Sequence, residues 1–264
     1  MSAPESYPDR AAAESTGLVE LDARLVLCRA CPRLVAWREE TALVKRPAFQ
    51  DWDYWARPVP GFGPADAALV VTGLAPAAHG GNRTGRMFTG DRAGDLLFST
   101  LHGLGLASQA EATHPDDGLE LYGVRVTAPV HCAPPDNRPT PGERDTCRPW
   151  LAQELRLLRP TMRSVVVLGA FGWQATLSAL AEAGWSVPRP RPVFGHGVRT
   201  TLTPADGTGS AITLFGCYHV SQRNVFTGRL TPAMVRDVLA TAARSAGLPV
   251  DEFDGNGSGP GAPL

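Results

Sequence analysis

The chain has 264 residues and a mass of 28.0 kDa, a size that fits one large domain or two small ones. Hydrophobic residues make up 43% and charged residues 19% of the chain, which excludes an intrinsically disordered protein. The net charge is −1, so the overall charge does not indicate a nucleic-acid partner. No apolar run approaches the roughly 20 residues of a membrane span, and the N-terminus lacks the apolar segment of a secretory signal. We therefore expect a cytoplasmic protein with no membrane contact.

The two ends of the chain are polar and low in large apolar residues. Residues 1–16 predict a disordered leader, and residues 249–264, which include GNGSGPGAPL, predict a disordered tail. Between them we expect one domain over residues 17–248. Helical periodicity over 18–44 is interrupted at Pro32, because proline removes a backbone donor and clashes with the preceding turn.

Apolar strands and amphipathic helices alternate through the rest of the chain. Strands are expected at 67–73, 124–130, 163–169 and 211–217. Helices are expected at 92–104, 142–158, 170–183 and 232–246. A Pro-, Gly- and Arg-rich stretch at 186–210 is compatible with a hairpin. This alternation predicts an α/β fold, a three-layer α/β/α domain with a central four-stranded, mainly parallel sheet.

Three long loops follow the ends of predicted strands, at 73–91, 131–141 and 218–230. Ligands of parallel sheets bind beyond the carboxyl ends of the strands. We therefore expect these loops to converge on one site. His219 lies just past the last strand, where a catalytic histidine would be placed, although a structural histidine is the commoner case.

The 73–91 loop has five glycines, which would allow a backbone to approach phosphate closely. It matches neither the P-loop nor the dinucleotide fingerprint. Phe88 beside Asp91 predicts a stacking platform next to a carboxylate. The alternative is a core phenylalanine and an aspartate that caps the following helix.

The five cysteines include one CxxC pair, Cys28 and Cys31, and the distant Cys132 and Cys147. Disulfides are not expected in a cytoplasmic protein. Three or four thiolates on loops indicate a metal ion or an iron–sulfur cluster, and spacing alone does not separate zinc from a cluster. Unrelated buried thiols are the remaining alternative.

A basic segment lies near the C-terminal end of the predicted domain. Residues 186–229 contain five arginines and one aspartate, a local charge of +4. Such a segment can form a phosphate-binding face in a protein of nearly neutral net charge. A solvated arginine surface is the alternative.

The motifs together resemble the family 5 (type b) uracil-DNA glycosylases. The segments that carry the resemblance are GLAPAAHGGNRTGRMFTGD at 73–91, HCAPPDNRPTP at 131–141, Cys147, and HVSQRNVFTGRL at 219–230. It runs from about Cys28 to Leu230. The resemblance implies a DNA repair enzyme that flips uracil, and other deaminated or damaged bases, out of DNA and hydrolyses the N-glycosidic bond, leaving an abasic site.

The resemblance also implies roles for individual residues. A [4Fe–4S] cluster would be held by Cys28, Cys31, Cys132 and Cys147, with Cys217 left to the core. The implied catalytic residues are Asp91, Asn137 and His219. The implied base-binding residues are Phe88, Ala128, Gly73 and Ala75. The implied DNA contacts are Arg83, Arg86, Arg223 and Arg229, with Arg223 a candidate to fill the space that the flipped base leaves.

Three positions bear on how this chain would differ from its relatives. The first motif has apolar residues after Gly73, where related families carry an acidic or polar residue, so Asp91 is the obvious acid. Val220 replaces a proline that is usual after the motif histidine. Ala128 stands where a related uracil-specific family has asparagine. Alanine cannot read the O4 and N3–H of uracil, so we expect broad specificity that includes hypoxanthine.

The expected partner is DNA that contains uracil or other deaminated bases, bound by a monomer; contact with a replication clamp is left open by the sequence. One alternative is an iron–sulfur protein that binds nucleic acid or transfers electrons without glycosylase activity. Another is a structural zinc module. Both would keep the cysteines, and neither needs Asp91, Asn137 and His219 together.

Overall fold

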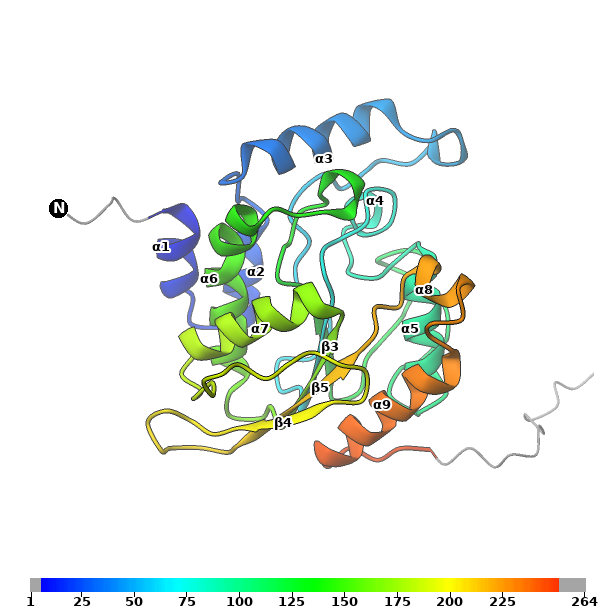
Figure 1. The fold of residues 1–264 in the computed structure, drawn as a ribbon. Coiled ribbons are helices and arrows are strands. Elements are labelled where there is room, and N and C mark those ends of the chain that lie inside the picture. The colour runs from blue at the N-terminus through cyan, green and yellow to red at the C-terminus, as the bar shows by residue number, and fades with distance from the viewer. Residues whose placement is uncertain (1–5, 252–264) are drawn as a thin grey trace, which may run out of the picture.

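One five-stranded sheet in the order β2-β1-β3-β5-β4 lies at the centre of the computed structural model, which describes residues 6–251 (Figure 1). Four strands run parallel, and they are β1 (Leu69–Thr72), β2 (Val124–Thr127), β3 (Ser164–Leu168) and β5 (Ile212–Cys217). The mainly parallel sheet is as predicted, but it has one strand more. The fifth strand is β4 (Arg199–Leu202), which pairs antiparallel with β5 at the edge. The sequence shows no apolar run there, because most of this edge strand remains accessible to water.

Helices cover both faces of the sheet. The longer ones are α1 (Tyr7–Ala13), α2 (Leu18–Leu25), α3 (Pro32–Val44), α5 (Arg92–His102), α6 (Pro141–Leu158), α7 (Ala170–Glu182) and α9 (Pro232–Ser245). Two short helices are α4 (Gly81–Thr84) and α8 (Gln222–Phe226), and Pro47–Phe49 and Pro135–Asn137 form 3₁₀ turns. The long helices from 18 to 246 lie where the sequence predicts them, within about two residues.

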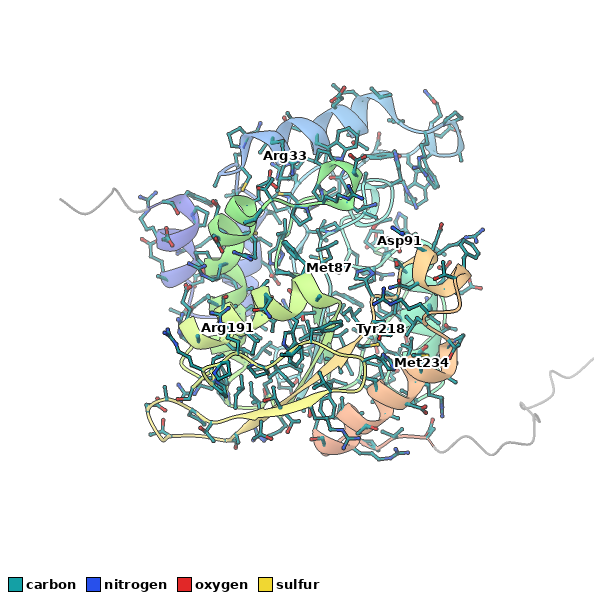
Figure 2. The ribbon with its side chains drawn as sticks, viewed as in Figure 1. Arg33, Met87, Asp91, Arg191, Tyr218 and Met234 are labelled. Carbon is teal, nitrogen blue, oxygen red and sulfur yellow. The ribbon has the colours of Figure 1, made fainter. Side chains whose placement is uncertain are left out.

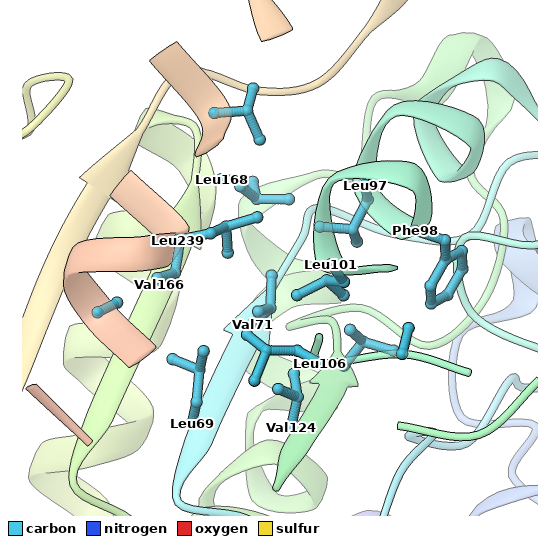
Figure 3. Packing of buried hydrophobic residues seen from close by; sticks show 14 of the residues in the cluster. Leu69, Val71, Leu97, Phe98, Leu101, Leu106, Val124, Val166, Leu168 and Leu239 are labelled. Carbon is cyan, nitrogen blue, oxygen red and sulfur yellow. The ribbon is translucent and has the colours of Figure 1, made fainter. Parts of the chain in front are cut away.

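The alternation of side chains along each strand separates two apolar cores. Val71, Val126 and Val166 point into the core under α5 and α9, together with Leu97, Leu101 and Leu239 (Figure 3). Their chain neighbours Val70, Val165 and Val167 point into a second core with residues of α1, α2, α6 and α7. Successive side chains of a strand face opposite ways, so a strand buried on both faces is a continuous apolar run. This arrangement confirms the predicted three layers.

The predicted leader is wrong for the residues that the structure describes. Residues 7–13 form α1, which packs against α6, and Ala11 and Ala12 are buried there. The Tyr7 hydroxyl donates to the Arg24 carbonyl at 2.9 Å, and the Gln153 amide donates to the Ser15 carbonyl at 2.7 Å. The small side chains of Ala11 and Ala12 allow α1 to pack closely on α6. Composition does not reveal this contact, because the segment contains few large apolar residues.

The predicted tail lies mostly outside the described residues. Its first residues are attached to the domain, since Val250 packs on the core under α9 and the Asp251 amide donates to the Leu104 carbonyl at 3.2 Å. Val250 and Asp251 therefore do not belong to the predicted tail, and residues 252–264 lie outside the described residues. Between residues 6 and 251, no helix combines the length and the hydropathy needed to cross a bilayer.

A buried ionic network joins α2, β2 and α6. Arg125 donates through Nε to Glu154 at 2.5 Å and through Nη2 to Asp22 at 3.1 Å. The Thr127 hydroxyl donates to the other Glu154 oxygen at 2.6 Å. Gly61 makes room for this pair, because a Cβ there would collide with both side chains. Buried charges that are fully paired fix the elements that carry them.

Candidate active site

Phe88 lies over the carboxyl end of β1. A Cβ at Gly73 would come within 2.6 Å of the Phe88 ring, and a Cβ at Gly94 would overlap the Phe88 carbonyl. Phe88 itself has a φ of 54°, a left-handed conformation that L residues rarely adopt. Strain of this kind persists only where the surrounding structure fixes it, and it gathers at functional sites. The two glycines therefore exist in part to hold this aromatic ring in place.

Asp91 is the N-cap of α5 (Figure 2). Its Oδ1 accepts hydrogen bonds from the Ala93 amide at 3.0 Å and the Gly94 amide at 2.9 Å, and its Oδ2 faces Gly80. Burial raises the pKa of this carboxyl, while the two amide donors act against that shift. The helix-cap alternative from the sequence is thus confirmed, and the cap leaves the second carboxylate oxygen beside the glycine-rich loop.

His219 follows β5 directly. Gly169, at the end of β3, has a φ of 95°, and a Cβ there would lie 3.4 Å from the His219 Cβ. The side-chain amide of Asn224 donates a hydrogen bond to the His219 carbonyl at 2.8 Å and so fixes the turn. Burial lowers the pKa of the His219 ring to about 4, so the ring is neutral at pH 7. A neutral imidazole can still donate one hydrogen bond.

The 73–91 loop and the 218–230 segment both start at the carboxyl edge of the parallel strands. The Gly73 amide donates to the Thr127 carbonyl at 2.9 Å, and the Gly169 amide donates to the Cys217 carbonyl at 2.8 Å. A Cβ at Gly172 would lie 2.7 Å from the Gly73 carbonyl, so α7 also starts against this edge. These contacts link the ends of β1, β2, β3 and β5 in one place.

The remaining predicted base contacts lie on the same loops. Ala128, the residue after β2, is 1% exposed and belongs to the core under α5, onto which Phe88 packs. Ala75 packs with Phe171 beside Val130 and Leu34. Ala128 is therefore both a core residue and a neighbour of the strand ends.

Asn137 occupies a different environment. It ends a 3₁₀ turn after β2 with a φ of 54°, and its side chain is exposed. Its backbone amide donates to the Pro134 carbonyl at 3.2 Å. Asparagine is among the residues that tolerate this conformation best. The turn presents the Asn137 amide group to the solvent rather than to Asp91 or His219.

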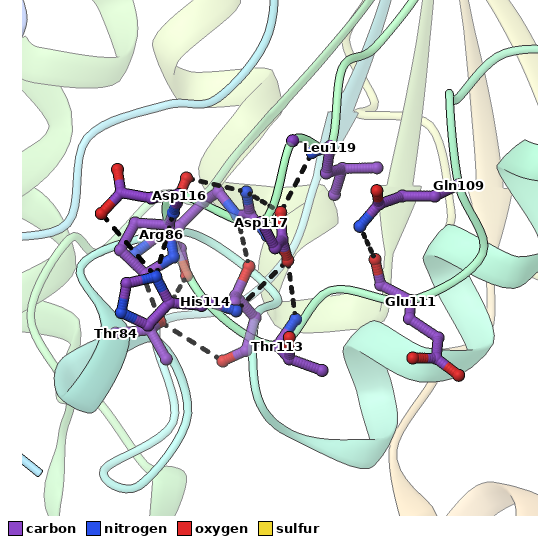
Figure 4. Close-up of polar contacts among 12 residues, drawn as sticks. Thr84, Arg86, Gln109, Glu111, Thr113, His114, Asp116, Asp117 and Leu119 are labelled. Carbon is purple, nitrogen blue, oxygen red and sulfur yellow. Dashed lines mark hydrogen bonds and ion pairs between the residues drawn. The ribbon is translucent and has the colours of Figure 1, made fainter.

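Arg83 and Arg86 do not form the predicted DNA-contacting surface. Arg83 is 4% exposed, donates to the carbonyls of His79 and Gly90 at 2.7 and 3.0 Å, and lies 3.9 Å from the Phe49 ring centre. Arg86 is 5% exposed and forms an ion pair with Asp117 at 2.6 Å (Figure 4). The loop has too few apolar side chains to fill its own interior. Arg83 bonds two of its carbonyls instead, and Arg86 bonds the Thr89 hydroxyl and ties the loop to Pro115 and Asp117.

Arg223 and Arg229 are exposed, as the prediction for DNA contacts requires. The Arg229 guanidinium carbon lies 4.6 Å from the Tyr218 ring centre. Phe226 on α8 is 72% exposed and lies beside Arg92, 5.7 Å from ring centre to guanidinium carbon. The sequence analysis missed Phe226 as a site residue. Its signal was a phenylalanine among the polar and basic residues of the last motif, outside any apolar pattern.

Four cysteines line one small hollow, and they are Cys28, Cys31, Cys132 and Cys147. Burial, together with the neighbouring cysteines, raises the pKa of Cys31 to about 11 and that of Cys147 well above its usual value. Cys217 lies apart, buried at the end of β5 in the core under α9. Within residues 6–251, no group of three or more His, Cys, Asp or Glu side chains is arranged to hold a metal ion.

Comparison with known proteins shows the family to which this chain belongs. Residues 60–243 match the uracil DNA glycosylase superfamily. The type-5 uracil-DNA glycosylase of Mycobacterium tuberculosis is 53% identical over 88% of this chain and 82% of its own length. The chain belongs to the type-5 uracil-DNA glycosylases.

Other members of the family come from distant organisms. The type-5 uracil-DNA glycosylase of Thermus thermophilus is 48% identical over 85% of this chain and 96% of its own length. The one of Pyrobaculum aerophilum is 44% identical over 85% of this chain and 91% of its own length. The family that the motifs indicated is thus confirmed, and the match covers nearly all of the described domain.

Proposed function

We propose that this chain removes uracil from DNA by hydrolysing the N-glycosidic bond, and that it acts as a monomer on DNA in the cytoplasm. The observation that carries the proposal is that Phe88 and His219 lie against the glycines that follow β1 and β3, with Asp91 three residues beyond Phe88, in a chain of this family. These three side chains offer a stacking surface, a carboxylate and a neutral hydrogen-bond donor. Base excision needs all three kinds of group.

The chemistry divides between two side chains. As the glycosidic bond breaks, positive charge grows on the sugar and negative charge on the base. Asp91 would stabilise the sugar cation or accept a proton from the attacking water through Oδ2, because its Oδ1 is held by the α5 amides. His219 would donate a hydrogen bond to the departing base, and a neutral ring does so without leaving a buried cation behind.

The nucleotide must leave the helix before either group can reach it. Phe88 would stack on the flipped base, since its aromatic ring is only partly buried and is held against the Gly73 backbone at the end of β1. Asn137 would approach from the exposed turn and contact the base or its sugar when DNA binds. Arg223 and Arg229 would bind the flanking phosphates.

A [4Fe–4S] cluster is the second part of the proposal, and the donor set fits it. Four thiol side chains from three separate segments line one hollow, and burial disfavours their thiolates unless a cationic centre compensates. Hydrolysis of the glycosidic bond moves no electrons, so the cluster would have a structural role. When bound, it would join the N-terminal helices to the 132–147 segment through its bonds to the cysteines. Zinc would satisfy thiolates too, and chemical analysis separates the two metals.

Ala128 supports a substrate range broader than uracil. Its methyl group can neither donate nor accept, so the pocket would lack the hydrogen bonds that distinguish uracil from other bases. We infer that deaminated purines such as hypoxanthine are also released. An iron–sulfur protein without glycosylase activity would not need Asp91, Phe88 and His219 at one edge, and the family disfavours it.

One assay tests the proposed reaction. The purified protein is incubated with oligonucleotides that carry uracil, hypoxanthine, xanthine, ethenocytosine or mismatched thymine, in single and double strands. Release of uracil with an abasic product is the expected result. An intact uracil-containing strand in every context, from a folded protein, would contradict the proposal.

A further inference from the structure

Arg38, in the middle of α3, is a buried cation beside the cysteine-lined hollow. It is 2% exposed, and its Nη1 donates to the Cys132 Sγ at 2.9 Å. Its Nη2 donates to the Cys28 carbonyl at 3.2 Å. Its Nε has no hydrogen-bond acceptor among the described residues. The guanidinium group thus reaches two of the four cysteine-bearing positions.

No carboxylate balances this charge. Within residues 6–251, none of the ion pairs between basic and acidic side chains includes Arg38. The acids near it are engaged elsewhere, since Glu39 pairs with Arg29 and Glu143 pairs with Arg33. An unpaired charge away from water costs several kcal/mol. The carboxylates of the described residues therefore do not supply a partner for the buried Arg38 cation.

The backbone of Arg38 is also fixed. The Asn82 side chain, itself fully buried, donates to the Arg38 carbonyl at 3.2 Å. Asn82 lies in the glycine-rich loop, and its carbonyl accepts from the Ala56 amide at 3.0 Å. Because the residue is held at its backbone as well as its side chain, the guanidinium cannot swing out to the solvent.

We propose that Arg38 is the counter-ion of the cluster that the proposed function places among these cysteines, acting through a charge-assisted hydrogen bond to Cys132. This inference rests on the cofactor proposed above. A cluster bound by four thiolates carries net negative charge, which an adjacent buried cation stabilises. The same hydrogen bond makes Cys132 unlike the other three ligands, and Arg38 is a positioning residue rather than a catalytic one.

The test compares the full-length protein with three variants. Arg38→Met removes the positive charge and keeps a long side chain. Arg38→Lys keeps the charge but replaces the planar guanidinium group by an ammonium group. Arg29→Met is the matched control, because it removes a cation between Cys28 and Cys31 that is exposed and bonds only Glu39. Iron and sulfide content, the rate of loss of visible absorbance under excess chelator, and the reduction potential are measured on each.

We expect Arg38→Met to lose iron about 10–100-fold faster than wild type, the usual effect of removing a group that orients a metal ligand. Its reduction potential should become more negative, since a cation favours the added electron. Arg38→Lys should keep a potential near that of wild type and lose iron at an intermediate rate. Arg29→Met should stay close to wild type in both measurements.

Unchanged iron loss and potential in Arg38→Met would overturn the inference. If Arg38→Met does not fold, Arg38→Lys provides the test. A reduction potential of Arg38→Lys that is clearly more negative than that of wild type, although the positive charge is kept, would also overturn the inference. A third readout separates charge from packing. Removal of Arg38 should lower the Tm of the iron-loaded protein but not that of the iron-depleted protein. Equal losses in both would make Arg38 a packing residue.

The cofactor and the reaction fail separately. Wild-type protein that contains no iron or sulfide overturns the cluster and this inference together. Base release by such a protein would leave the proposed hydrolysis standing.

Discussion

The loop 73–91 and the segment 218–230 both contain arginines, both follow parallel strands, and yet they are built in opposite ways. The first is buried, with Arg83 and Arg86 bonded to carbonyls and to Asp117 inside the protein. The second exposes Arg223, Arg229 and Phe226 to the solvent. A basic residue in a motif therefore indicates a DNA contact only when something else fills the interior of its loop.

The difference follows from composition. The five glycines of the first loop let its backbone pack closely but add no side-chain volume, so the backbone carbonyls inside the loop need internal hydrogen-bond donors. Long guanidinium side chains supply five donors each. In the second segment α8 satisfies its own backbone, and its arginines are free to face outward. The first loop is held from within around Asp91 and Phe88, and the second is exposed, as the proposed contact surface for DNA requires.

Asp91→Asn probes the rigid loop with the largest expected effect. Asparagine caps helices as well as aspartate does, so α5 should keep its start while the negative charge is lost. Base release should fall by roughly 10²–10⁴-fold, and binding to uracil-containing DNA should survive. Single-turnover rates measure the loss, and Asp95→Asn, on the exposed side of α5, is the control. A near-normal rate would reduce Asp91 to a helix cap.

Arg86→Met tests whether the loop is held from within. The substitution leaves the partly buried Asp117 without its cationic partner; burial opposes ionisation there, while Arg86 and three backbone amides hold its pKa below the usual range. Losing this pair, whose acid keeps its amide donors, should lower the free energy of unfolding by about 1–3 kcal/mol. Denaturant melts of this variant and of Arg223→Met provide the comparison. Equal stability in the two variants would contradict the interior role of Arg86.

His219 is a partly buried residue of the 218–230 segment, and its titration distinguishes it from the arginines there. Burial lowers its pKa to about 4 in the folded protein, against about 6.5 in the unfolded chain. Between pH 6.5 and 4 the unfolded chain therefore binds a proton that the folded protein does not, and stability falls as the pH falls. His219→Gln should lose less Tm than wild type between pH 7 and pH 4.5. Parallel losses would mean that the ring is solvated.

Arg223→Met should change DNA affinity and leave stability unchanged, the reverse of Arg86→Met. Each phosphate contact adds about −0.9 to the slope of log K against log salt, so the slope should become shallower by about one unit. Fluorescence anisotropy with labelled duplexes at several salt concentrations measures it. The same slope in both proteins would remove Arg223 from the phosphate contacts.

Ala128→Asn should have the smallest effect, a shift in the ratio of two rates. The new amide can pair with uracil and takes space from a purine, so preference for uracil over hypoxanthine should rise. Single-turnover rates on both substrates, for wild type and variant, give the ratio. Iron content and Tm must match wild type, because the position is also part of the core. An unchanged ratio in a folded variant would show that residue 128 does not read the base.

The sequence predicted the elements with strong periodicity and missed those held by contacts across the chain. The parallel strands are continuous apolar runs, so β1 and β3 were found within a residue or two. Edge strand β4 and helix α1 lack such runs, and pairing with β5 and packing on α6 decide their structure. Local pattern does not contain those partners.

The candidate site divides in the same way. The glycines predicted where the backbone would come close to other groups, and Gly73, Gly80 and Gly94 do lie against Phe88 and Asp91. The sequence could not show that Arg83 and Arg86 turn inward, because charge alone does not reveal which side of a loop faces solvent. Arg38 was missed for a related reason, since its partners lie 10 and 94 residues away.

The network of Asp22, Arg125 and Glu154 holds together the elements around the cysteine-lined hollow without involving the cysteines themselves. It ties α2, which precedes Cys28, to β2, which precedes Cys132, and to α6, which carries Cys147. None of its bonds involves sulfur. If the proposed cluster is correct, the chain would therefore keep its cysteine-bearing segments together before iron binds, and the metal would be inserted into a folded protein.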